Sequence, residues 1–339
     1  MKSKLVKTIT TAALICFSLM LCVASAQAAK KVIRLQCVYP ETSNGGLMVK
    51  TFAKKVDKYT KGKVEVKLFW PNQLVKVKEA YTAVSKGMVD ALYAASIYYG
   101  GIVPAVKSEF LPLTWSSPED AYDLFYNGGY LDLLREANGV KGVWLLGTTF
   151  SGSMGLMTNF DVTGLDSLKG KKIRAMSVDA SLVKQLGASP VAMPGTEMYA
   201  AMKRGTIDGV IYPYYVLDTY KFFEVTTNVV LPGIHTPNPV DLYMNLKLWK
   251  SLPPETQQAL ERACEETCLL SALWSEKWNN DAMRTAKDKN IKIVELSKAD
   301  QEKLYALARE DWKKTAEQSP ELKKAVVLIE NYLKGKKGK

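Results

Sequence analysis

Apolar and polar residues alternate near the start of the chain, and this pattern predicts a β-strand over residues 32–40. Apolar residues then recur every three or four positions from Met48 to Tyr59, which predicts a helix that Gly62 ends. A strand, a helix and another strand follow at 64–69, 79–86 and 88–94. This order of elements is typical of a doubly wound sheet with helices on both faces.

The same order returns in the middle of the chain, after the apolar run GVWLLGTTF. Strands are predicted at 171–177, 190–194 and 206–213, with helices at 178–187 and 196–204 between them. The C-terminal part is mostly helical. It begins with one long helix over 252–290 that has Pro254 in its first turn. A strand at 291–296 follows, and then two helices, the first of which begins with a capping box of Ser297 and Asp300.

Two stretches of the chain resemble each other. EAYTAVSKGMVDAL (79–92) and EMYAAMKRGTIDGV (197–210) align without a gap, and Glu, Tyr, Ala, Gly and Asp coincide. Gly87 and Gly205 suit the left-handed conformation that ends a helix. Asp90 and Asp208 lie beside apolar strand residues, where we expect each carboxylate to accept backbone N–H bonds in the following turn. The repeat predicts two similar α/β lobes, each of which contains one copy.

The fold class that follows is α/β, a two-lobed binding-protein fold in which each lobe is a doubly wound sheet and a long C-terminal helix spans both. We expect residues 29–150 and 236–285 to form lobe I, and residues 151–235 and 286–339 to form lobe II. In open α/β sheets, ligands bind beyond the carboxyl ends of the strands. Two such lobes place these ends on either side of a cleft, which can close on a solute by a hinge motion.

The first 28 residues have the pattern of a cleaved secretory signal peptide. Three lysines precede an apolar run, and ASAQA supplies the small residues that a signal peptidase needs. An uncleaved membrane anchor is the alternative. Removal of this segment lowers the net charge from +12 to +9. The remaining lysines are dispersed and no nucleic-acid motif is present, so we do not expect nucleic acid as a partner.

Residue types needed for many kinds of catalysis are scarce. His235 is the only histidine, and it lies near a segment that we expect to cross between the lobes, where a structural hydrogen bond is its expected role. The sequence has no G-x-S-x-G motif, Walker A loop or G-x-G-x-x-G motif. Three cysteines remain after export, Cys37, Cys264 and Cys268, and we expect them to be buried as small apolar residues. We therefore expect no enzyme, no cofactor and no metal.

Several segments together resemble the extracytoplasmic substrate-binding proteins of TRAP (tripartite ATP-independent periplasmic) transporters, the DctP-type family. The resemblance covers nearly all of the mature chain and is carried by four segments, KTFAKKVDKYTKGKVEVKLFWPNQL, EFLPLTW, 164–213 and the segment HTPNPVDLYMNLKLWKSLPPETQQAL that begins at His235. It implies two α/β lobes, a helix that spans both, and binding of a small organic anion for delivery to a membrane permease.

The resemblance also implies ligand-binding residues in lobe II. Arg174 stands in the K-G-x-K-I-R strand, where relatives pair an arginine with the ligand carboxylate. A guanidinium fits such an anion because it is planar and always charged. Many relatives have a second arginine in a G-x-R motif, where this chain has Met154 flanked by Ser151 and Ser153 as donors. Relatives commonly have Asn-Pro after the D-G strand, and here Tyr212 stands before Pro213.

Tyrosines and the turns of lobe I complete the expected site. Tyr212, Tyr214 and Tyr215 either form an aromatic wall with hydroxyl donors or pack in the core. The turns after the lobe I strands should face the cleft and offer Tyr39, Asn44, Ser96, Tyr98 and Trp115, together with Glu41, Thr42 and Tyr99.

The sequence therefore predicts a periplasmic TRAP-type receptor for a small organic anion. With one arginine, a monoanion is favoured over a dicarboxylate, and a monocarboxylate, a C2 sulfonate such as isethionate and an aromatic acid all remain open. The expected partners are the small and large permease subunits. Two alternatives from other classes are an exported enzyme with a pKa-shifted carboxylate couple in its cleft and a periplasmic sensor or adaptor of the same fold.

Overall fold

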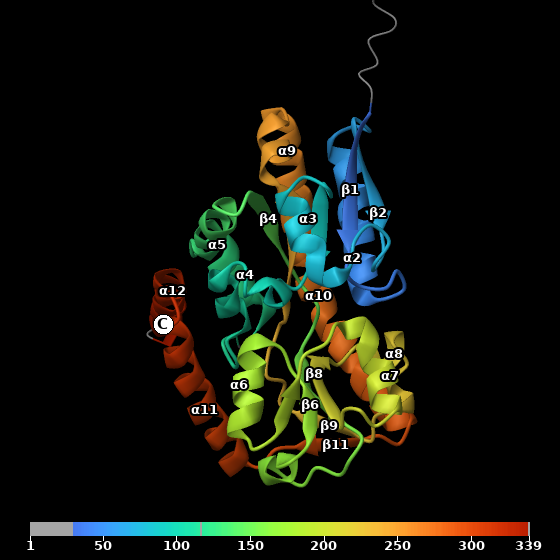
Figure 1. The fold of residues 1–339 in the computed structure, drawn as a ribbon, viewed down its shortest axis with the longest axis vertical. Coiled ribbons are helices and arrows are strands. Elements are labelled where there is room, and N and C mark those ends of the chain that lie inside the picture. The colour runs from blue at the N-terminus through green and yellow to red at the C-terminus, as the bar shows by residue number, and fades with distance from the viewer. Residues whose placement is uncertain (1–29, 116, 338–339) are drawn as a thin grey trace, which may run out of the picture.

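Two β-sheets organise the chain, as the computed structural model shows for residues 30–115 and 117–337 (Figure 1). The predicted signal peptide lies outside these residues. The first lobe holds five strands in the order β2-β1-β3-β10-β4 and the second lobe holds six in the order β11-β9-β5-β8-β6-β7. The strands are β1 Lys31–Cys37, β2 Val64–Phe69, β3 Ala91–Ala94, β4 Val143–Phe150, β5 Met154–Thr158, β6 Lys172–Arg174, β7 Ser189–Val191, β8 Gly209–Pro213, β9 Asn228–Leu231, β10 Pro239–Asn245 and β11 Lys292–Glu295.

Helices cover both sheets. The first lobe contains α2 Asn44–Tyr59, α3 Ala80–Ser85, α4 Pro118–Tyr126, α5 Tyr130–Gly139 and α9 Leu246–Ser251, with the 3-10 helices η1 Val77–Glu79, η2 Ser96–Tyr99 and η3 Pro104–Phe110. The second contains α6 Ser177–Gln185, α7 Met198–Lys203 and α8 Val216–Thr219, with η4 Leu165–Leu168, η5 Gly195–Glu197 and η6 Phe222–Glu224. The last three helices are α10 Pro254–Asp288, α11 Lys298–Ala316 and α12 Pro320–Lys337. The predicted α/β fold with two lobes is confirmed.

The sheets are mixed, whereas the strand–helix order alone predicted parallel ones. The parallel pattern holds for β2-β1-β3 and for β7-β6-β8. However, β10 runs antiparallel to both of its neighbours, and so does β5. Each of these two strands enters its sheet directly after the chain has crossed from the other lobe, and it therefore runs against the strands that its own lobe builds.

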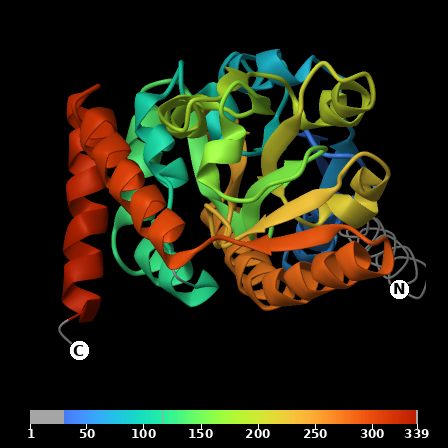
Figure 2. The same cartoon turned by 90° about the horizontal axis from the view of Figure 1, so that it is seen from below.

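The C-terminal helices join the two lobes. Helix α10 is 35 residues long and packs on α2, α4 and β4 of the first lobe and on α8 and β11 of the second (Figure 1). The predicted spanning helix is confirmed. Helix α11 packs on α6 of the second lobe, whereas α12 packs on η3 and α5 of the first, and together they form a layer beside both lobes (Figure 2). The predicted assignment of residues 29–150 and 236–285 to one lobe, and of 151–235 and 286–339 to the other, stays a prediction.

Two short segments, 151–153 and 232–238, carry the other crossings. They are hydrogen-bonded to each other: the Ser151 N–H donates to the Asn238 carbonyl at 3.0 Å, and the Met154 N–H donates to the His235 carbonyl at 2.8 Å. The N–H of His235 donates back to the Met154 carbonyl at 3.1 Å. The two crossing segments therefore run side by side between the lobes, and these main-chain bonds hold them together.

The repeated sequence occupies equivalent places in the two sheets. Gly87 and Gly205 end α3 and α7 with φ of 72° and 67°, as predicted. The role expected for the aspartates was wrong in one respect, because they bind the neighbouring strand and not the following turn. Asp90 Oδ2 accepts from the Arg34 N–H at 2.8 Å, and Asp208 Oδ2 accepts from the Lys172 N–H at 2.7 Å. Each carboxylate thus fixes the register of the strand beside it.

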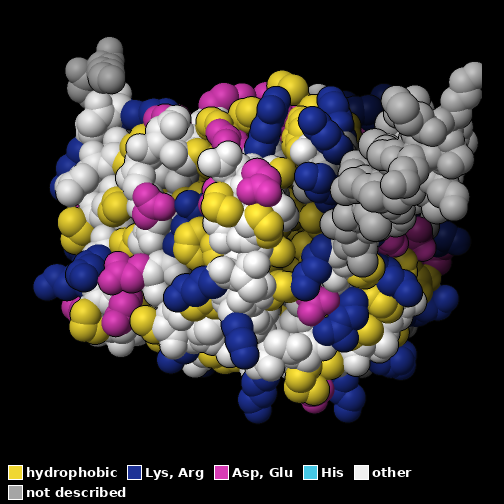
Figure 3. All heavy atoms as spheres, turned by 90° about the horizontal axis from the view of Figure 1, so that it is seen from above, with side chains coloured by type: hydrophobic (Ala, Val, Ile, Leu, Met, Phe, Trp, Pro, Cys, Tyr) yellow, Lys and Arg dark blue, Asp and Glu magenta, His cyan; other side chains and the backbone are white. Residues whose placement is uncertain are grey.

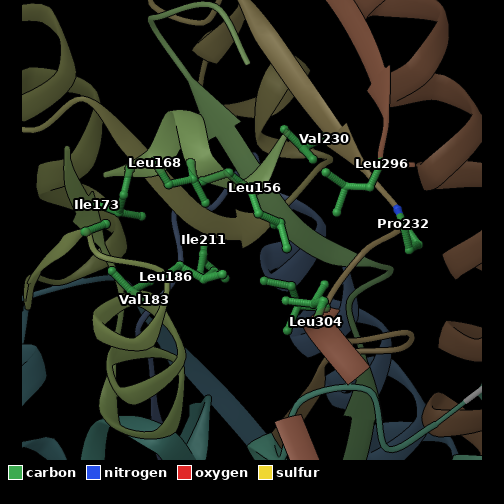
Figure 4. A pocket seen from close by; sticks show the side chains of 13 residues that line it. Leu156, Leu168, Ile173, Val183, Leu186, Ile211, Val230, Pro232, Leu296 and Leu304 are labelled. Atoms are coloured by element: carbon green, nitrogen blue, oxygen red, sulfur yellow. The ribbon is translucent and has the colours of Figure 1, made fainter. Parts of the chain in front are cut away.

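Strand alternation in the second lobe separates its core from the interlobe side. Ile173 and Ile211 point into an apolar cavity of about 30 Å³ inside this lobe, which Leu156, Val183 and other aliphatic residues line (Figure 4). Their neighbours in sequence, Arg174 and Tyr212, therefore face the opposite side of the sheet. All three described cysteines are free and buried, as expected.

The surface carries scattered positive charge. Figure 3 shows Lys and Arg side chains in separate groups over the end of the first lobe, with acidic and apolar side chains between them. Among the described residues, no helix has both the length and the apolar character that crossing a bilayer requires.

Candidate functional site

A small cavity lies between the two lobes at the carboxyl ends of β1, β3, β6 and β8. Its volume is about 20 Å³, which is room for a water molecule. The first lobe, the crossing segments and the second lobe all contribute to its lining, which consists of Tyr39, Ala95, Ile97, Tyr98, Phe110, Met154, Asn238, Arg174, Met176, Asp179, Tyr212 and Pro213. The cleft predicted from strand order is thus present, and it is closed.

Among the described residues that form this lining, Arg174 is the single cation, and it is only 3% exposed. Its Nε donates to the Met193 carbonyl and its Nη1 to the Ile211 carbonyl, both at 3.1 Å. Its Nη2 lies 3.5 Å from Tyr98 Oη across the cleft, and the guanidinium stands 5.1 Å from the centre of the Tyr212 ring. Two of the five N–H groups are thus occupied by backbone carbonyls, and the Nη edge remains for an anion.

The first lobe has a glutamine at the place of Arg174. Gln36 lies near the end of β1, and Arg174 is the last residue of β6. Gln36 pairs with Leu92 of β3 and Arg174 pairs with Val210 of β8. Leu92 and Val210 are equivalent positions of the repeat, so Gln36 and Arg174 are equivalent too. Gln36 Nε2 donates to the Val75 carbonyl at 2.8 Å, as Arg174 Nε does to that of Met193. Gln36 therefore binds the loop that follows the edge strand β2, and Arg174 binds the loop that follows the edge strand β7. Arg174 combines this structural bond with a charge that Gln36 lacks.

Three of the predicted tyrosines line the cavity with Arg174. Tyr39 and Tyr98 come from the first lobe and Tyr212 from the second. The Ala95 N–H donates to Tyr39 Oη at 3.1 Å, which leaves the hydroxyl proton of Tyr39 free to donate. Burial raises the pKa of Tyr39 and of Tyr212 well above the ordinary value of 10, so both remain neutral hydroxyls.

Other predicted residues lie close to the cavity or support it. Met154 lines the cavity, and its predicted role in ligand binding stays a prediction. Ser151 Oγ accepts from Asn238 Nδ2 at 2.8 Å, and Ser153 is bound by Asn279 of α10, so both serines serve the crossing segments. Tyr215 is outside the lining and packs near Trp278 at a ring distance of 6.4 Å.

The remaining predicted residues of the first lobe are not brought to the cavity. Asn44 is buried at the start of α2, and Ser96 is fully buried as the first residue of η2. Trp115 packs 5.9 Å from Phe125 in an aromatic cluster that lies towards the C-terminal helices. The sequence placed them in turns after strands, but each of these turns folds back into the core of its lobe.

Comparison with known proteins decides the family. The sequence matches the family described as bacterial extracellular solute-binding protein, family 7, over residues 36–319. The chain belongs to this family. The resemblance to TRAP solute-binding proteins drawn from the sequence is thereby confirmed.

Relatives of this family 7 protein are distant in sequence. It is 26% identical over 270 residues to a monocarboxylate 2-oxoacid-binding periplasmic protein of Nostoc sp., covering 78% of this chain and 73% of the relative. It is 26% identical to a TRAP periplasmic solute-binding protein of Rhodobacter sphaeroides solved in an apo, open form, with a TM-score of 0.70, covering 90% and 98% of the two chains. A Chromohalobacter salexigens protein solved with bound D-glucuronate is 24% identical, with a TM-score of 0.80, covering 88% and 99%.

Two polar residues of the cavity were not predicted from the sequence. Asp179 stands in the first turn of α6, and its Oδ1 lies 2.7 Å from Nε2 of His235. Asn238 lies in the second crossing segment. An acidic residue five positions after Arg174 is a signal that could have been used, but it also suits an ordinary helix start. Nothing in the sequence pattern distinguishes Asn238.

A carboxylate couple is also present in this solute-binding protein, but not in the cavity lining. Glu109 of η3 and Asp241 of β10 are both fully buried in the first lobe, beneath Ser96. Burial raises the pKa of Glu109 well above its ordinary 4.5 and that of Asp241 from 3.8 to about 6. Asp241 also accepts from the Tyr243 hydroxyl at 2.7 Å. The couple that would favour an enzyme therefore lies outside the cavity lining.

Proposed function

We propose that this protein is the periplasmic receptor of a TRAP transporter, which captures a small organic anion between its lobes and delivers it to the small and large permease subunits. In this proposal the signal sequence directs export and is cleaved. The anion, a carboxylate or a small sulfonate, binds the free Nη edge of Arg174. The observation that carries the proposal is that Arg174 is the only cation in the lining of the closed interlobe cavity.

The surroundings of Arg174 support anion capture. A guanidinium that is 3% exposed needs a counter-charge, because an isolated buried charge is costly, and among the described residues its direct contacts are two carbonyl oxygens, the Tyr98 hydroxyl and the Tyr212 ring. An anionic ligand supplies this charge. The Nostoc relative, named for 2-oxoacids, and the glucuronate-bound neighbour bind organic acids, which is consistent with the proposed ligand class.

The size of the cavity supports a closing mechanism. A volume of about 20 Å³ does not admit an organic acid, so entry requires the lobes to separate. The Tyr98–Arg174 contact spans the cleft at 3.5 Å and would break on opening. The higher TM-score with the ligand-bound neighbour than with the open apo structure agrees with a closed arrangement.

Thermal-shift measurements with purified mature protein test the proposal, using a panel of small carboxylates and sulfonates. A ligand at a hundred times its Kd adds about 2.7 kcal/mol to the free energy of unfolding. The decisive variant is Arg174→Gln, because Gln36 shows that glutamine can hold the equivalent loop in this fold without a charge. We expect the stabilisation by ligand to vanish in this variant, while the melting temperature without ligand stays close to that of the wild type.

Two outcomes would contradict the proposal. If Arg174→Gln binds the anion as tightly as the wild type does, Arg174 is not part of the binding site. If no anion stabilises the wild type, and mass spectrometry finds no ligand retained from the expression host, the receptor function itself would be wrong. Turnover of a bound anion would instead identify an enzyme.

A further inference from the structure

The cavity has hydrogen-bond acceptors as well as the Arg174 donor. Asn238 is 3% exposed and lines the cavity, and its Oδ1 has no hydrogen-bond partner. The orientation of its amide follows from its other contact, in which Nδ2 donates to Ser151 Oγ at 2.8 Å. The Ser151 hydroxyl donates to the main-chain carbonyl of Asn238 at 3.4 Å, so Ser151 Oγ is the acceptor of the bond from Nδ2, and the amide oxygen of Asn238 is left without a partner among the described residues. A buried acceptor of this kind needs a donor, and a bound ligand can supply it.

Asp179 contributes a carboxylate to the same lining. It is 1% exposed, lines the cavity and is paired with Nε2 of His235 at 2.7 Å. The other ring nitrogen of His235, Nδ1, is buried without a partner. The bond to His235 uses one of the two carboxylate oxygens of Asp179, and a carboxylate has lone pairs on both oxygens with which to accept from a ligand.

The lining thus contains a group of hydrogen-bond donors around a cation and a group of hydrogen-bond acceptors that includes an anion. Arg174 is its one cation and Asp179 its one anion, and every other lining residue of the part of the chain described is uncharged. Tyr98 and Tyr212, at 3.5 Å from Arg174 Nη2 and 5.1 Å from its guanidinium, surround the donor group. The acceptor group consists of Asp179 and Asn238 Oδ1. A ligand that satisfied only Arg174 would leave an unpaired amide oxygen and a carboxylate in a closed cavity.

We infer that the ligand of this site is a zwitterion, with a carboxylate or sulfonate at Arg174 and an ammonium group at Asp179 and Asn238. This inference rests on the proposed function and specifies its ligand class. An ammonium group carries three donor protons and a positive charge, so it can satisfy both acceptors and the charge of Asp179 together. A hydroxyl in place of the ammonium group has one donor proton and no charge, so it can bind either Asp179 or Asn238 Oδ1 but not both.

Isothermal titration with two matched pairs of probes tests this inference on the wild-type protein. The pairs are taurine with isethionate, and β-alanine with 3-hydroxypropionate. The members of each pair differ only in an ammonium group that replaces a hydroxyl. We expect the amino member of at least one pair to bind about tenfold or more tightly than its hydroxy partner, the scale of one hydrogen bond to a charged group.

Variants of the acceptor group provide the second test. Asp179→Asn keeps the shape of the side chain and removes its charge, so it should abolish the preference for the amino member of each pair. Ser151→Ala frees the Asn238 amide to rotate and should reduce the preference without abolishing it. Circular dichroism melting shows whether each variant is folded. If Asp179→Asn does not fold, the comparison of probes on the wild type still decides.

The outcomes separate this inference from the proposed function. Equal or tighter binding of the hydroxy members by the wild type would overturn the zwitterion assignment and leave an anion receptor. An amino preference that persists in folded Asp179→Asn would overturn the role of Asp179. Binding of none of the four probes would also overturn the assignment, and the Arg174→Gln panel would then decide the proposed function separately.

Discussion

At the scale of single residues, burial decides what each charged group can do. Arg174 and Asp179 are almost fully buried at the cleft, where a ligand can complete their contacts. Glu109 and Asp241 are buried in the first lobe, where no such completion is available; burial raises the pKa of both carboxyls, and Asp241 raises that of Glu109 further. The first pair therefore indicates binding, and the second affects stability.

The Glu109–Asp241 couple predicts that stability falls as pH rises. Raised pKa values mean that the folded protein keeps protons that the unfolded chain releases above about 4 to 4.5, so unfolding becomes easier from there upward. Glu109→Gln imitates the protonated acid and should be more stable than the wild type at pH 8 by on the order of 2 kcal/mol. At pH 4 the two proteins should be nearly equal. Urea unfolding at both pH values measures this.

A neighbouring exposed glutamate provides the control for that prediction. Glu119→Gln in the first turn of α4 changes the same type of group at the surface and should shift stability by no more than about 0.5 kcal/mol at either pH. If the difference in unfolding free energy between the wild type and Glu109→Gln is the same at pH 4 and pH 8, the couple does not titrate as described.

At the scale of elements, the two copies of the helix–glycine–strand repeat perform the same task with different surroundings. In each copy a glycine ends the helix and an aspartate binds the backbone of the parallel strand beside it. Asp90 is further bound by the Arg34 guanidinium, which keeps the pKa of Asp90 below its ordinary value despite the opposing effect of burial. The shared part of the repeat thus holds strand register in both sheets.

The glycine that ends α7 gives a test at this scale. Gly205 has a φ of 67°, and a Cβ built on it would meet no atom within 4 Å, so any cost of Gly205→Ala is conformational. We expect this variant to lose about 1 kcal/mol of unfolding free energy. The matched control is Gly139→Ala, at the end of α5, which has equal space and no positive φ. The control should be neutral or stabilising. Equal effects in the urea midpoints of the two variants would contradict the assignment.

At the scale of the whole molecule, the lobes are connected by the segments 151–153 and 232–238, by helix α10, and by α11 and α12, which pack on the second and the first lobe. The segment 151–153 is tied to α10 by one side chain. Asn279 of α10 accepts from the Ser153 N–H at 2.8 Å and donates to Ser153 Oγ at 2.9 Å. The lobe connection is therefore a small hydrogen-bonded unit that includes the long helix.

Removal of this link should loosen the connection. Asn279→Ala leaves the Ser153 backbone N–H without its acceptor, and we expect a loss of about 1–2 kcal/mol in urea unfolding. Asn280→Ala, at the exposed neighbouring position of the same helix, should change stability by less than about 0.5 kcal/mol. If Asn279→Ala is as stable as Asn280→Ala, the tie between helix and crossing segment contributes nothing.

The sequence by itself determined the local elements, the repeat and the family. Strand alternation, helical spacing and the stops at Gly62, Gly87 and Gly205 are properties of short segments, so they can be identified without knowledge of the tertiary contacts. The long helix with Pro254 in its first turn was predicted correctly for the same reason. Arg174 was chosen from the family resemblance, and the structure places it in the cavity, although its role in binding stays a prediction.

Only the tertiary structure decided which side chains meet. The antiparallel entry of β5 and β10 depends on where the chain crosses between the lobes. Trp115, Asn44 and Ser96 occupy turns that fold back into the first lobe, whereas Asp179 and Asn238 reach the cavity from a helix start and a crossing segment. The physical reason is that a cleft is formed by segments far apart in the chain. Its lining depends on sheet register and on the hydrogen bonds between crossings, which no local pattern encodes.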